Sequence, residues 1–250
     1  MKLSKHNNKP EIFHSIQGEG KSTGIPSIFI RTSLCNLHCI WCDTDYTWNW
    51  ENTNFKHNND AIKGYKKYKK EDQIIELMVP EIVDIVSNME CKHIILTGGE
   101  PLIQQRELTE LMQELKKIDP DYFFEVETNG TIVPVTEFDQ AIDQYNVSPK
   151  LQNSAMDHDI RIKPKPLELL SRSDKSNFKF VVSSETDLEE IILLQKEFNI
   201  DSSKIHLMPE GTTAKQLNEK TRWLVEICKQ YNFNFSNRLH VHIWGSKRGI

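Results

Sequence analysis

The chain has 250 residues, of which 38% are hydrophobic and 27% charged, and its formal net charge is −5 at pH 7. This composition is ordinary for a globular protein and excludes disordered and fibrous chains, while the negative charge argues against broad nonspecific binding of nucleic acid. The N-terminus shows no apolar signal-peptide segment, and no stretch approaches the roughly 18 apolar residues of a membrane helix. We therefore expect a cytoplasmic protein with no membrane partner.

Short β-branched or aromatic segments alternate along the chain with longer segments of helical period. The predicted strands lie at Ser27–Thr32, His93–Thr97, Tyr122–Glu127, Gln144–Val147, Asn177–Val182, Lys204–Met208 and Leu239–Trp244. The predicted helices lie at Asp72–Met89, Gln104–Ile118, Leu167–Ser171, Thr186–Phe198 and Thr213–Tyr231. Pro80 is expected to kink or divide the first helix. This alternation predicts a mainly parallel α/β sheet, and about six units predict a partial, open TIM-like (β/α)6 barrel.

Residues 46–70 are polar and rich in asparagine and lysine, so we expect an insertion within a single domain that spans residues 1–250. The insertion contains a basic run, Lys63–Lys70 (KGYKKYKK). Such a run could contact an anion such as tRNA, but a solvated surface is the favoured interpretation for a run this short.

Polar, glycine-, proline- or serine-containing loops follow six of the predicted strands. These loops are Cys35–Thr44, Gly98–Pro101, Thr128–Gly130, Ser148–Lys150, Ser183–Glu185 and Pro209–Gly211. The carboxyl ends of parallel strands meet at one rim, where α/β barrels build their active sites. We therefore expect the six loops to form one site.

Three of the five cysteines, Cys35, Cys39 and Cys42, form a C-x3-C-x2-C triplet directly after the first predicted strand. Buried cysteines on a helix face are one interpretation, but the flanking sequence does not continue a helical period. A closed Cys3His zinc site with His38 and an iron–sulfur cluster are the alternatives. Cys91 and Cys228 are better explained as core residues. A four-iron cluster held by the triplet would therefore keep one iron free.

The triplet, together with GGEP (Gly98–Pro101) after the second strand, resembles the radical S-adenosylmethionine (SAM) superfamily. The resemblance implies that the triplet holds a [4Fe–4S] cluster, whose free iron binds SAM and whose electron cleaves it to a 5′-deoxyadenosyl radical. Gly98 and Gly99 would let the backbone approach the methionine amino group, and Glu100 would carry charge at the rim. The SAM contacts implied are Gly98, Gly99, Glu100, Glu127, Thr128, Asn129, Ser148 and Lys150.

Within that superfamily, the chain resembles the 7-carboxy-7-deazaguanine synthases over almost its whole length. The segments that carry the resemblance are SIQGEG, FIR, CDT, TGGEP, ETNG, SPK, KFVVS and the late LHVHIWG. The resemblance implies a carbon–nitrogen lyase that contracts 6-carboxy-5,6,7,8-tetrahydropterin to 7-carboxy-7-deazaguanine with loss of ammonia, in 7-deazapurine (queuosine) biosynthesis.

The same resemblance implies a set of substrate and metal contacts. The substrate contacts implied are Gln17, Gly18, Glu19, Arg31, His240 and the C-terminal Ile250. An amide and a carboxylate suit the pterin's amino-pyrimidinone edge, and a guanidinium suits the substrate carboxylate. Thr44 would give its hydroxyl to Mg²⁺, with Asp43 either orienting that ion or capping the loop. Lys150 is the candidate catalytic residue for proton transfer.

Relatives of this kind also imply a homodimer and an external electron donor such as flavodoxin or ferredoxin. Two alternative functions remain open at this point. One is an activase of a glycyl-radical enzyme, which shares the triplet and GGEP. The other is a zinc-stabilised binding module that uses Cys35, His38, Cys39 and Cys42. In each case we expect no nucleic-acid partner.

Overall fold

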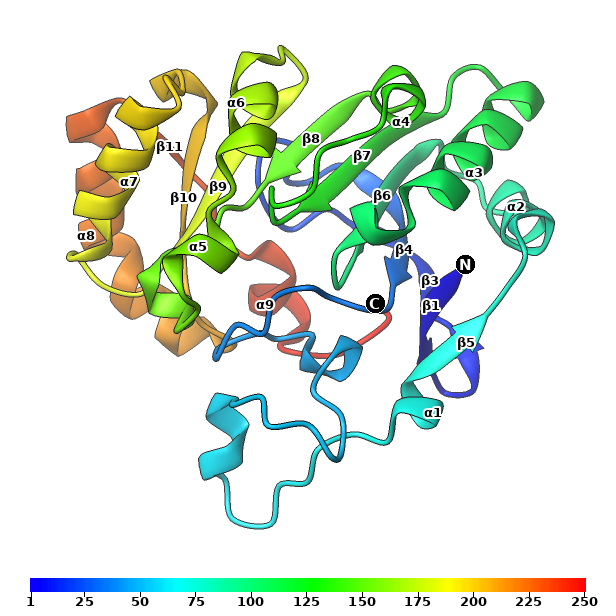
Figure 1. The fold of residues 1–250 in the computed structure, drawn as a ribbon, viewed down its shortest axis with the longest axis horizontal. Helices are drawn as coiled ribbons and strands as arrows, with labels where there is room; N and C mark the ends of the chain where they lie inside the picture. Colours follow the sequence, from blue (N-terminus) through cyan, green and yellow to red (C-terminus); the bar gives the residue numbers. More distant parts are fainter.

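The computed structural model describes residues 1–250 and places six parallel strands side by side in chain order (Figure 1). They are β4 (Pro26–Thr32), β6 (His93–Gly98), β7 (Phe123–Thr128), β8 (Gln144–Val147), β9 (Ser176–Val182) and β10 (Ile205–Pro209). The sheet ends at β11 (Asn234–Phe235) on one side and β2 (Lys9–Pro10) on the other, so it does not close. The prediction of a partial, open (β/α)6 barrel is confirmed.

Helices cover the parallel strands and bury their apolar faces in a core of 36 residues. The longer ones are α2 (Val79–Ser87), α3 (Gln105–Ile118), α6 (Pro164–Arg172), α7 (Asp187–Glu197) and α8 (Ala214–Tyr231), with shorter α4 (Thr136–Ala141) and α5 (His158–Arg161). In α3 the buried Leu108, Leu111, Met112 and Leu115 recur at helical spacing. This stripe packs on the sheet because an amphipathic helix is stable only when its apolar face is covered.

Four antiparallel strands, three at the N-terminus and one further along the chain, were not predicted, because each has five residues or fewer and no clear alternation. They are β1 (Lys2–His6), β2, β3 (Ile12–Ile16) and β5 (Ile74–Glu76). β3 pairs with β4 from Ile12 to Ile16, and the chain then turns inward through residues 17–24. There the Ser22 hydroxyl donates to Glu125 on β7, and the Gln144 amide on β8 donates to Ser22. The turn therefore lies within the sheet's concave interior and brings residues 17–19 under the rim.

Two predicted elements are wrong. The predicted strand Leu239–Trp244 is a helix, α9, although its alternating β-branched residues are typical of a strand. The predicted helix Asp72–Met89 is divided into α1 (Lys70–Gln73), β5 and α2, because Ile74–Glu76 pairs with the edge of β1. Pro80 does not kink a helix. It lies in the first turn of α2, where a missing N–H costs nothing.

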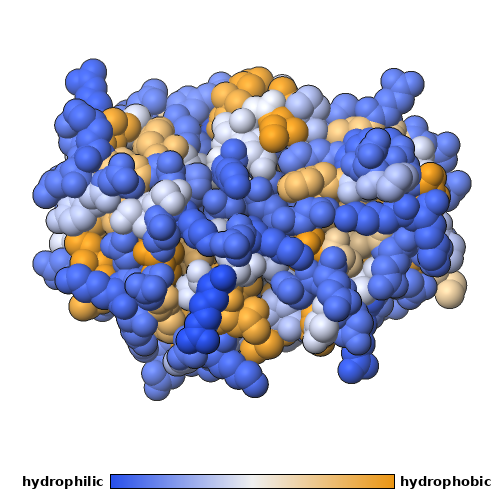
Figure 2. All heavy atoms as spheres, turned by 90° about the horizontal axis from the view of Figure 1, so that it is seen from above, coloured by the Kyte–Doolittle hydropathy of each residue, from blue (hydrophilic) through white to orange (hydrophobic).

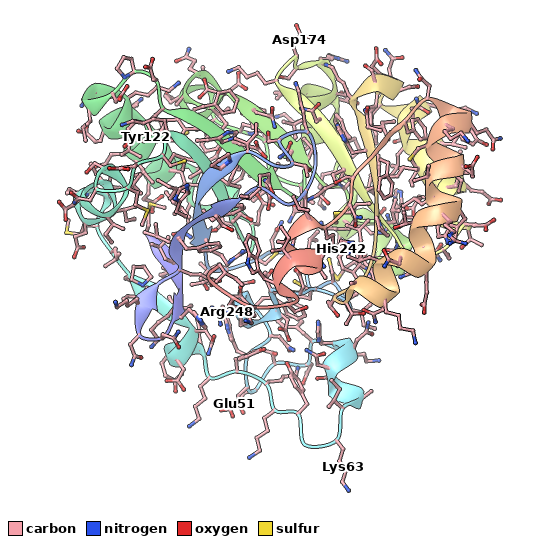
Figure 3. All side chains as sticks on the ribbon, turned by 180° about the vertical axis from the view of Figure 1, so that it is seen from behind. Glu51, Lys63, Tyr122, Asp174, His242 and Arg248 are labelled. Atoms are coloured by element: carbon pink, nitrogen blue, oxygen red, sulfur yellow. The ribbon has the colours of Figure 1, made fainter.

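Residues 46–70 project from the barrel beside the cysteine loop (Figure 1). A short 3₁₀ turn, Asp45–Thr47, leads into the segment, and a second one, Asn58–Ala61, lies within it. Tyr46 and Trp48 anchor the segment because both rings are buried against the domain. The tip, in contrast, carries exposed polar residues such as Lys63 (Figure 3).

The exposed apolar residues do not gather into one broad patch on the face in Figure 2, where small apolar groups are separated by polar side chains. Single exposed apolar side chains are normal on a folded protein. None of the helices combines the length and apolar character required to cross a bilayer.

The buried His206 on β10 predicts an acid-sensitive fold. Burial, together with the charges of Lys179 and Lys21, lowers the pKa of His206 to about 4. An unfolded imidazole takes up its proton below about pH 6.5, so stability is complete above that pH and falls as the pH drops toward 4. We expect about 2 kcal/mol less unfolding free energy at pH 5 than at pH 7 from this group. Urea denaturation of His206→Gln checks this, since an unchanged pH dependence would contradict it.

Candidate active site

A cavity of about 270 Å³ lies at the carboxyl ends of the parallel strands. Its lining includes Cys35, Cys39 and Cys42, Thr97–Gly99, Glu127–Asn129, Ser148 and Lys150, and Met208–Thr212. Five of the six predicted loops therefore meet in one site. Ser183–Glu185 is the exception, because the carboxylate of Asp187 accepts the N–H groups of Ser183 and Ser184 and holds this loop at the start of α7.

The three clustered cysteines line this cavity and are all largely buried. Burial raises the pKa of the Cys35 and Cys42 thiols and raises that of Cys39 to about 12. Such thiols stay protonated until a metal ion displaces the protons. His38 lies outside the cavity that the three cysteines line. Its ring stacks on Phe55, with ring centroids 3.4 Å apart, which disfavours the zinc module.

The surroundings of Cys42 fit a thiolate that ligates iron. The indole N–H of Trp48 is buried, has no hydrogen-bond acceptor within the chain, and lies beside Cys42, where it favours the charged thiolate. The Thr44 hydroxyl lies 3.5 Å from Cys42 Sγ. Donors directed at one sulfur stabilise its anionic form, as second-shell groups do in metal sites. Three thiols on one loop, with these donors beside them, therefore fit an iron–sulfur cluster.

The GGEP loop packs directly against the chain that leads into the cysteine loop. A Cβ on Gly98 would lie 2.0 Å from the Thr32 carbonyl oxygen, and one on Gly99 would lie 2.0 Å from that of Leu34. The glycines are thus required by contact with the chain that leads into Cys35, a reason that differs from the predicted approach to SAM. The prediction that Glu100 carries charge at the rim is also corrected, since its side chain is fully buried and lies outside the cavity lining.

Glu100 is buried because the next loop surrounds its carboxylate with donors. It accepts hydrogen bonds from the Thr128 hydroxyl (2.8 Å) and from the N–H groups of Asn129 (2.7 Å) and Leu102 (3.0 Å). Asn129 in turn donates through its amide to Asn36, 2.9 Å away in the cysteine loop. Glu100 therefore joins the two loops on which SAM binding is predicted.

Replacing Gly99 with alanine is expected to disturb the cysteine loop. The new Cβ would meet backbone at Leu34, which cannot move aside as a flexible side chain can. Overpacking of this kind costs about 1–3 kcal/mol, and we expect lower iron content after reconstitution. Gly64→Ala is the matched control, because open space surrounds Gly64 and only its φ of +86° opposes a side chain. Equal iron content and stability in the two variants would refute this expectation.

The remaining predicted SAM contacts lie along the cavity wall. Glu127 accepts from the Thr97 hydroxyl (2.6 Å) and from the Gln17 amide (3.2 Å). The Lys150 ammonium donates to the Ser148 hydroxyl at 2.9 Å. The charge of Lys150 also favours the thiolate of Cys39, which places Lys150 at the cysteine end of the cavity.

A group of paired charges lies in the same cavity, three of them largely buried and the fourth, Asp43, 41% exposed. Glu19 pairs with Lys179, and its Oε1 lies 2.9 Å from Arg238 Nε. Burial alone would raise the pKa of Glu19, but Lys179 and Arg238 outweigh it and hold the pKa well below its usual range. Arg238 also pairs with Asp43 and donates to the carbonyl of Gly211. We call Glu19, Lys179, Arg238 and Asp43 the charge cluster.

The other predicted substrate residues border this cluster. Arg31 donates through Nε to Glu11 at 3.2 Å, while its two Nη nitrogens make no hydrogen bond within the chain. Gly18 lies against His240, since a Cβ at Gly18 would be 2.2 Å from His240 Nδ1. Ile250 and the rest of the C-terminal tail also line the cavity. The structure therefore brings Gln17, Gly18, Glu19, Arg31, Thr44, His240 and Ile250 together.

Sequence reasoning missed several residues of the site. Arg238 and Glu11 received no role, although Arg238 lies immediately before LHVHIWG and Glu11 lies four residues before SIQGEG. Glu11 accepts from both Arg31 and Arg248, and the Arg248 guanidinium also lies over the Tyr46 ring. Charged residues that flank such segments were the one available signal.

The fold and this cavity define a radical SAM enzyme, and residues 29–151 match the radical SAM superfamily. That superfamily uses a [4Fe–4S] cluster and SAM. The chain is 34% identical to the 7-carboxy-7-deazaguanine synthase of Pyrobaculum aerophilum, over 96% of this chain and 95% of that protein. It is also 34% identical to that of Halobacterium salinarum, over 94% and 89%. The chain belongs to the 7-carboxy-7-deazaguanine synthase family.

A solved structure agrees with this assignment. The crystal structure of QueE from Escherichia coli superposes with a TM-score of 0.67 at 27% identity, covering 96% of this chain and 95% of that one. Neither the glycyl-radical activase nor the zinc module is favoured by these similarities.

Proposed function

We propose that this chain contracts 6-carboxy-5,6,7,8-tetrahydropterin to 7-carboxy-7-deazaguanine with loss of ammonia, as a step of 7-deazapurine biosynthesis. The observation that carries the proposal is the placement of the three-cysteine loop and the charge cluster in one cavity. The three-cysteine loop suits a redox cofactor, and the charge cluster suits a small polar substrate. Membership of the synthase family supports the same reaction.

At the cysteine end, Cys35, Cys39 and Cys42 would hold the cluster. When bound, the cluster supplies an electron that cleaves SAM to a 5′-deoxyadenosyl radical. Gly98, Gly99, Glu127, Thr128, Asn129, Ser148 and Lys150 border the cavity and would hold SAM, while Glu100 would act through Thr128 and Asn129. Lys150 is the candidate for proton transfer, since its ammonium lies near Cys39 and is bonded to Ser148.

At the other end, the charge cluster would bind the pterin. Lys179 and Arg238 favour the charged form of the Glu19 carboxylate, which would accept hydrogen bonds from the amino-pyrimidinone edge. The Gln17 side chain lies beside it, since its amide oxygen accepts the backbone N–H of Glu19. The free Nη nitrogens of Arg31 would meet the substrate carboxylate. His240 and Ile250 would close this end, which keeps water from the reacting carbon.

We further propose that Thr44 contributes its hydroxyl to Mg²⁺ that orients the substrate carboxylate. Magnesium keeps most of its waters and takes few protein ligands, so one hydroxyl suffices. Asp43 is held by Arg238, which supports a role in orienting the ion's surroundings. Removing Mg²⁺ with a chelator and restoring it tests this proposal, and turnover that is unaffected by Mg²⁺ would refute it.

The proposed reaction is tested by anaerobic turnover. The reconstituted enzyme is incubated with the carboxypterin, SAM and dithionite, and the product is identified by mass spectrometry. We expect 7-carboxy-7-deazaguanine together with ammonia. A reconstituted enzyme that cleaves SAM but forms no deazaguanine would refute the proposed substrate. The proposed homodimer is checked by sedimentation of the same preparation.

A further inference from the structure

The insertion at residues 46–70 is here called the basic lobe. Tyr46, Thr47 and Trp48 at its base line the cavity, but the rest of the lobe has no part in the proposed ring contraction. Its lysines are Lys56, Lys63, Lys66, Lys67, Lys69 and Lys70, against the acidic Glu51 and Asp60, in a chain whose net charge is −5. Lys56, Lys63, Lys66 and Lys69 are exposed and make no hydrogen bond or ion pair within the chain. Figure 3 shows Lys63 at the far tip, directed into solvent. These four lysines form no ion pairs within the chain, so their charges are available to bind another molecule.

The basic lobe packs directly on the cysteine loop. His57 Nε2 lies 2.8 Å from the carbonyl oxygen of Cys42, and the N–H of Asn58 donates to the carbonyl of Ile40 at 2.8 Å. Phe55 stacks on His38, which lies between Cys35 and Cys39 in the sequence. A partner bound to the lobe would therefore lie next to the loop that would hold the cluster.

The lobe also exposes apolar surface among its lysines. Ile62 is 59% exposed and Phe55 is 37% exposed. Apolar side chains surrounded by charged ones are a usual composition for a protein–protein interface. Dispersed positive charge at the rim of such a surface speeds the encounter with an acidic partner.

We propose that the basic lobe is the docking surface for an acidic one-electron carrier protein of the flavodoxin type. This inference rests on the proposed function, because a cluster that cleaves SAM needs an electron from outside the chain. One electron leaves the carrier's reduced flavin, which is thereby oxidised by one electron, and reduces the cluster from the 2+ to the 1+ state. RNA is disfavoured as the occupant because the lobe exposes the apolar Ile62 and Phe55 among its lysines and packs on the cysteine loop, which suits a protein electron carrier better than a phosphate backbone.

The test uses the full-length reconstituted enzyme and a purified flavodoxin as the probe. In the variant K63E/K66E/K69E, three exposed lysines without internal partners are reversed in charge. The control K165E/K196E/K215E makes the same change in charge at three exposed, unpaired lysines on α6, α7 and α8. Anaerobic stopped-flow absorbance gives the second-order rate constant for reduction of the cluster by reduced flavodoxin.

We expect the lobe variant to be reduced at least tenfold more slowly at low ionic strength, and the control within about twofold of the unsubstituted enzyme. High salt should remove the difference, because it screens exposed charges. Turnover with saturating dithionite should be equal in all three proteins. Dithionite-driven turnover also separates the two proposals. If the unsubstituted enzyme formed no deazaguanine with dithionite, the proposed ring contraction would be refuted. The rate at which flavodoxin reduces the cluster could still be measured in that case.

Three results would overturn the docking proposal. Equal rates of reduction by flavodoxin would show that the lysines do not contact the carrier. A parallel loss of dithionite-driven turnover would show that the lobe only supports the cysteine loop. Salt-sensitive tRNA binding that the lobe variant alone loses, with carrier reduction unchanged, would assign the surface to RNA instead.

Discussion

Replacement of Cys39 with alanine is expected to abolish product formation. Cys39 is buried and lines the cavity with Cys35 and Cys42, and no other cysteine lies in the cavity wall. Loss of one of three thiolates leaves a four-iron cluster with only two protein ligands, so we expect little bound iron and no visible absorbance. Iron analysis and an anaerobic turnover assay measure both effects.

Cys91→Ala is the matched control for this variant. Cys91 is partly buried, lies two residues before β6, and makes only weak S–H contacts with backbone carbonyls. We expect iron content and turnover close to those of the unsubstituted enzyme. If Cys39→Ala kept its cluster, or if Cys91→Ala lost it, the assigned set of ligands would be wrong. Circular dichroism confirms that both variants are folded.

Replacement of Glu19 with glutamine is expected to cost both stability and substrate binding. The substitution leaves Lys179 and Arg238 buried with their shared counter-charge removed. Breaking a buried ion pair by removing one partner typically costs about 3–5 kcal/mol of unfolding free energy. Because Glu19 also lines the cavity, we expect kcat/KM for the pterin to fall about 100-fold or more, which corresponds to about 3 kcal/mol.

Glu226→Gln is the control for the Glu19 variant. Glu226 is an exposed residue on α8 that pairs only with Lys229, so its loss should change stability by about 0.5 kcal/mol or less. Urea denaturation gives the stability difference, and kinetics are measured where both variants are folded. Near-normal stability together with an unchanged KM in Glu19→Gln would show that the charge cluster neither stabilises the fold nor binds the substrate.

Local patterns predicted the elements of the barrel well, because periodicity and turn residues act over a few positions. The β8 range Gln144–Val147 matches its prediction, and α3 and α8 begin within one residue of theirs. Local patterns failed where pairing or packing with a segment distant in the sequence determined the secondary structure. Ile74–Glu76 became a strand because β1 offered an edge, and the alternating Leu239–Trp244 became a helix that packs against Gly18.

In the active site, too, some features could be predicted from local sequence, while others depend on contacts between distant segments. The loops after the strands could be assigned to one rim from topology alone. The position of the Glu100 side chain could not, because it depends on which N–H groups the neighbouring loop turns toward it. The glycines of GGEP were correctly singled out for close contact, but the atoms they contact belong to the preceding strand and cysteine loop.

The class of fold, the three-cysteine loop and the family could all be inferred from the chain before its structure was considered, since each depends on residues close together in the chain or on motifs in a set order. The charge cluster could be recognised only after folding. Glu19 lies 160 residues from Lys179 and 219 from Arg238, and no local pattern relates them. The physical reason is that a buried carboxylate needs nearby cations to remain ionised, and folding alone brings those cations to it.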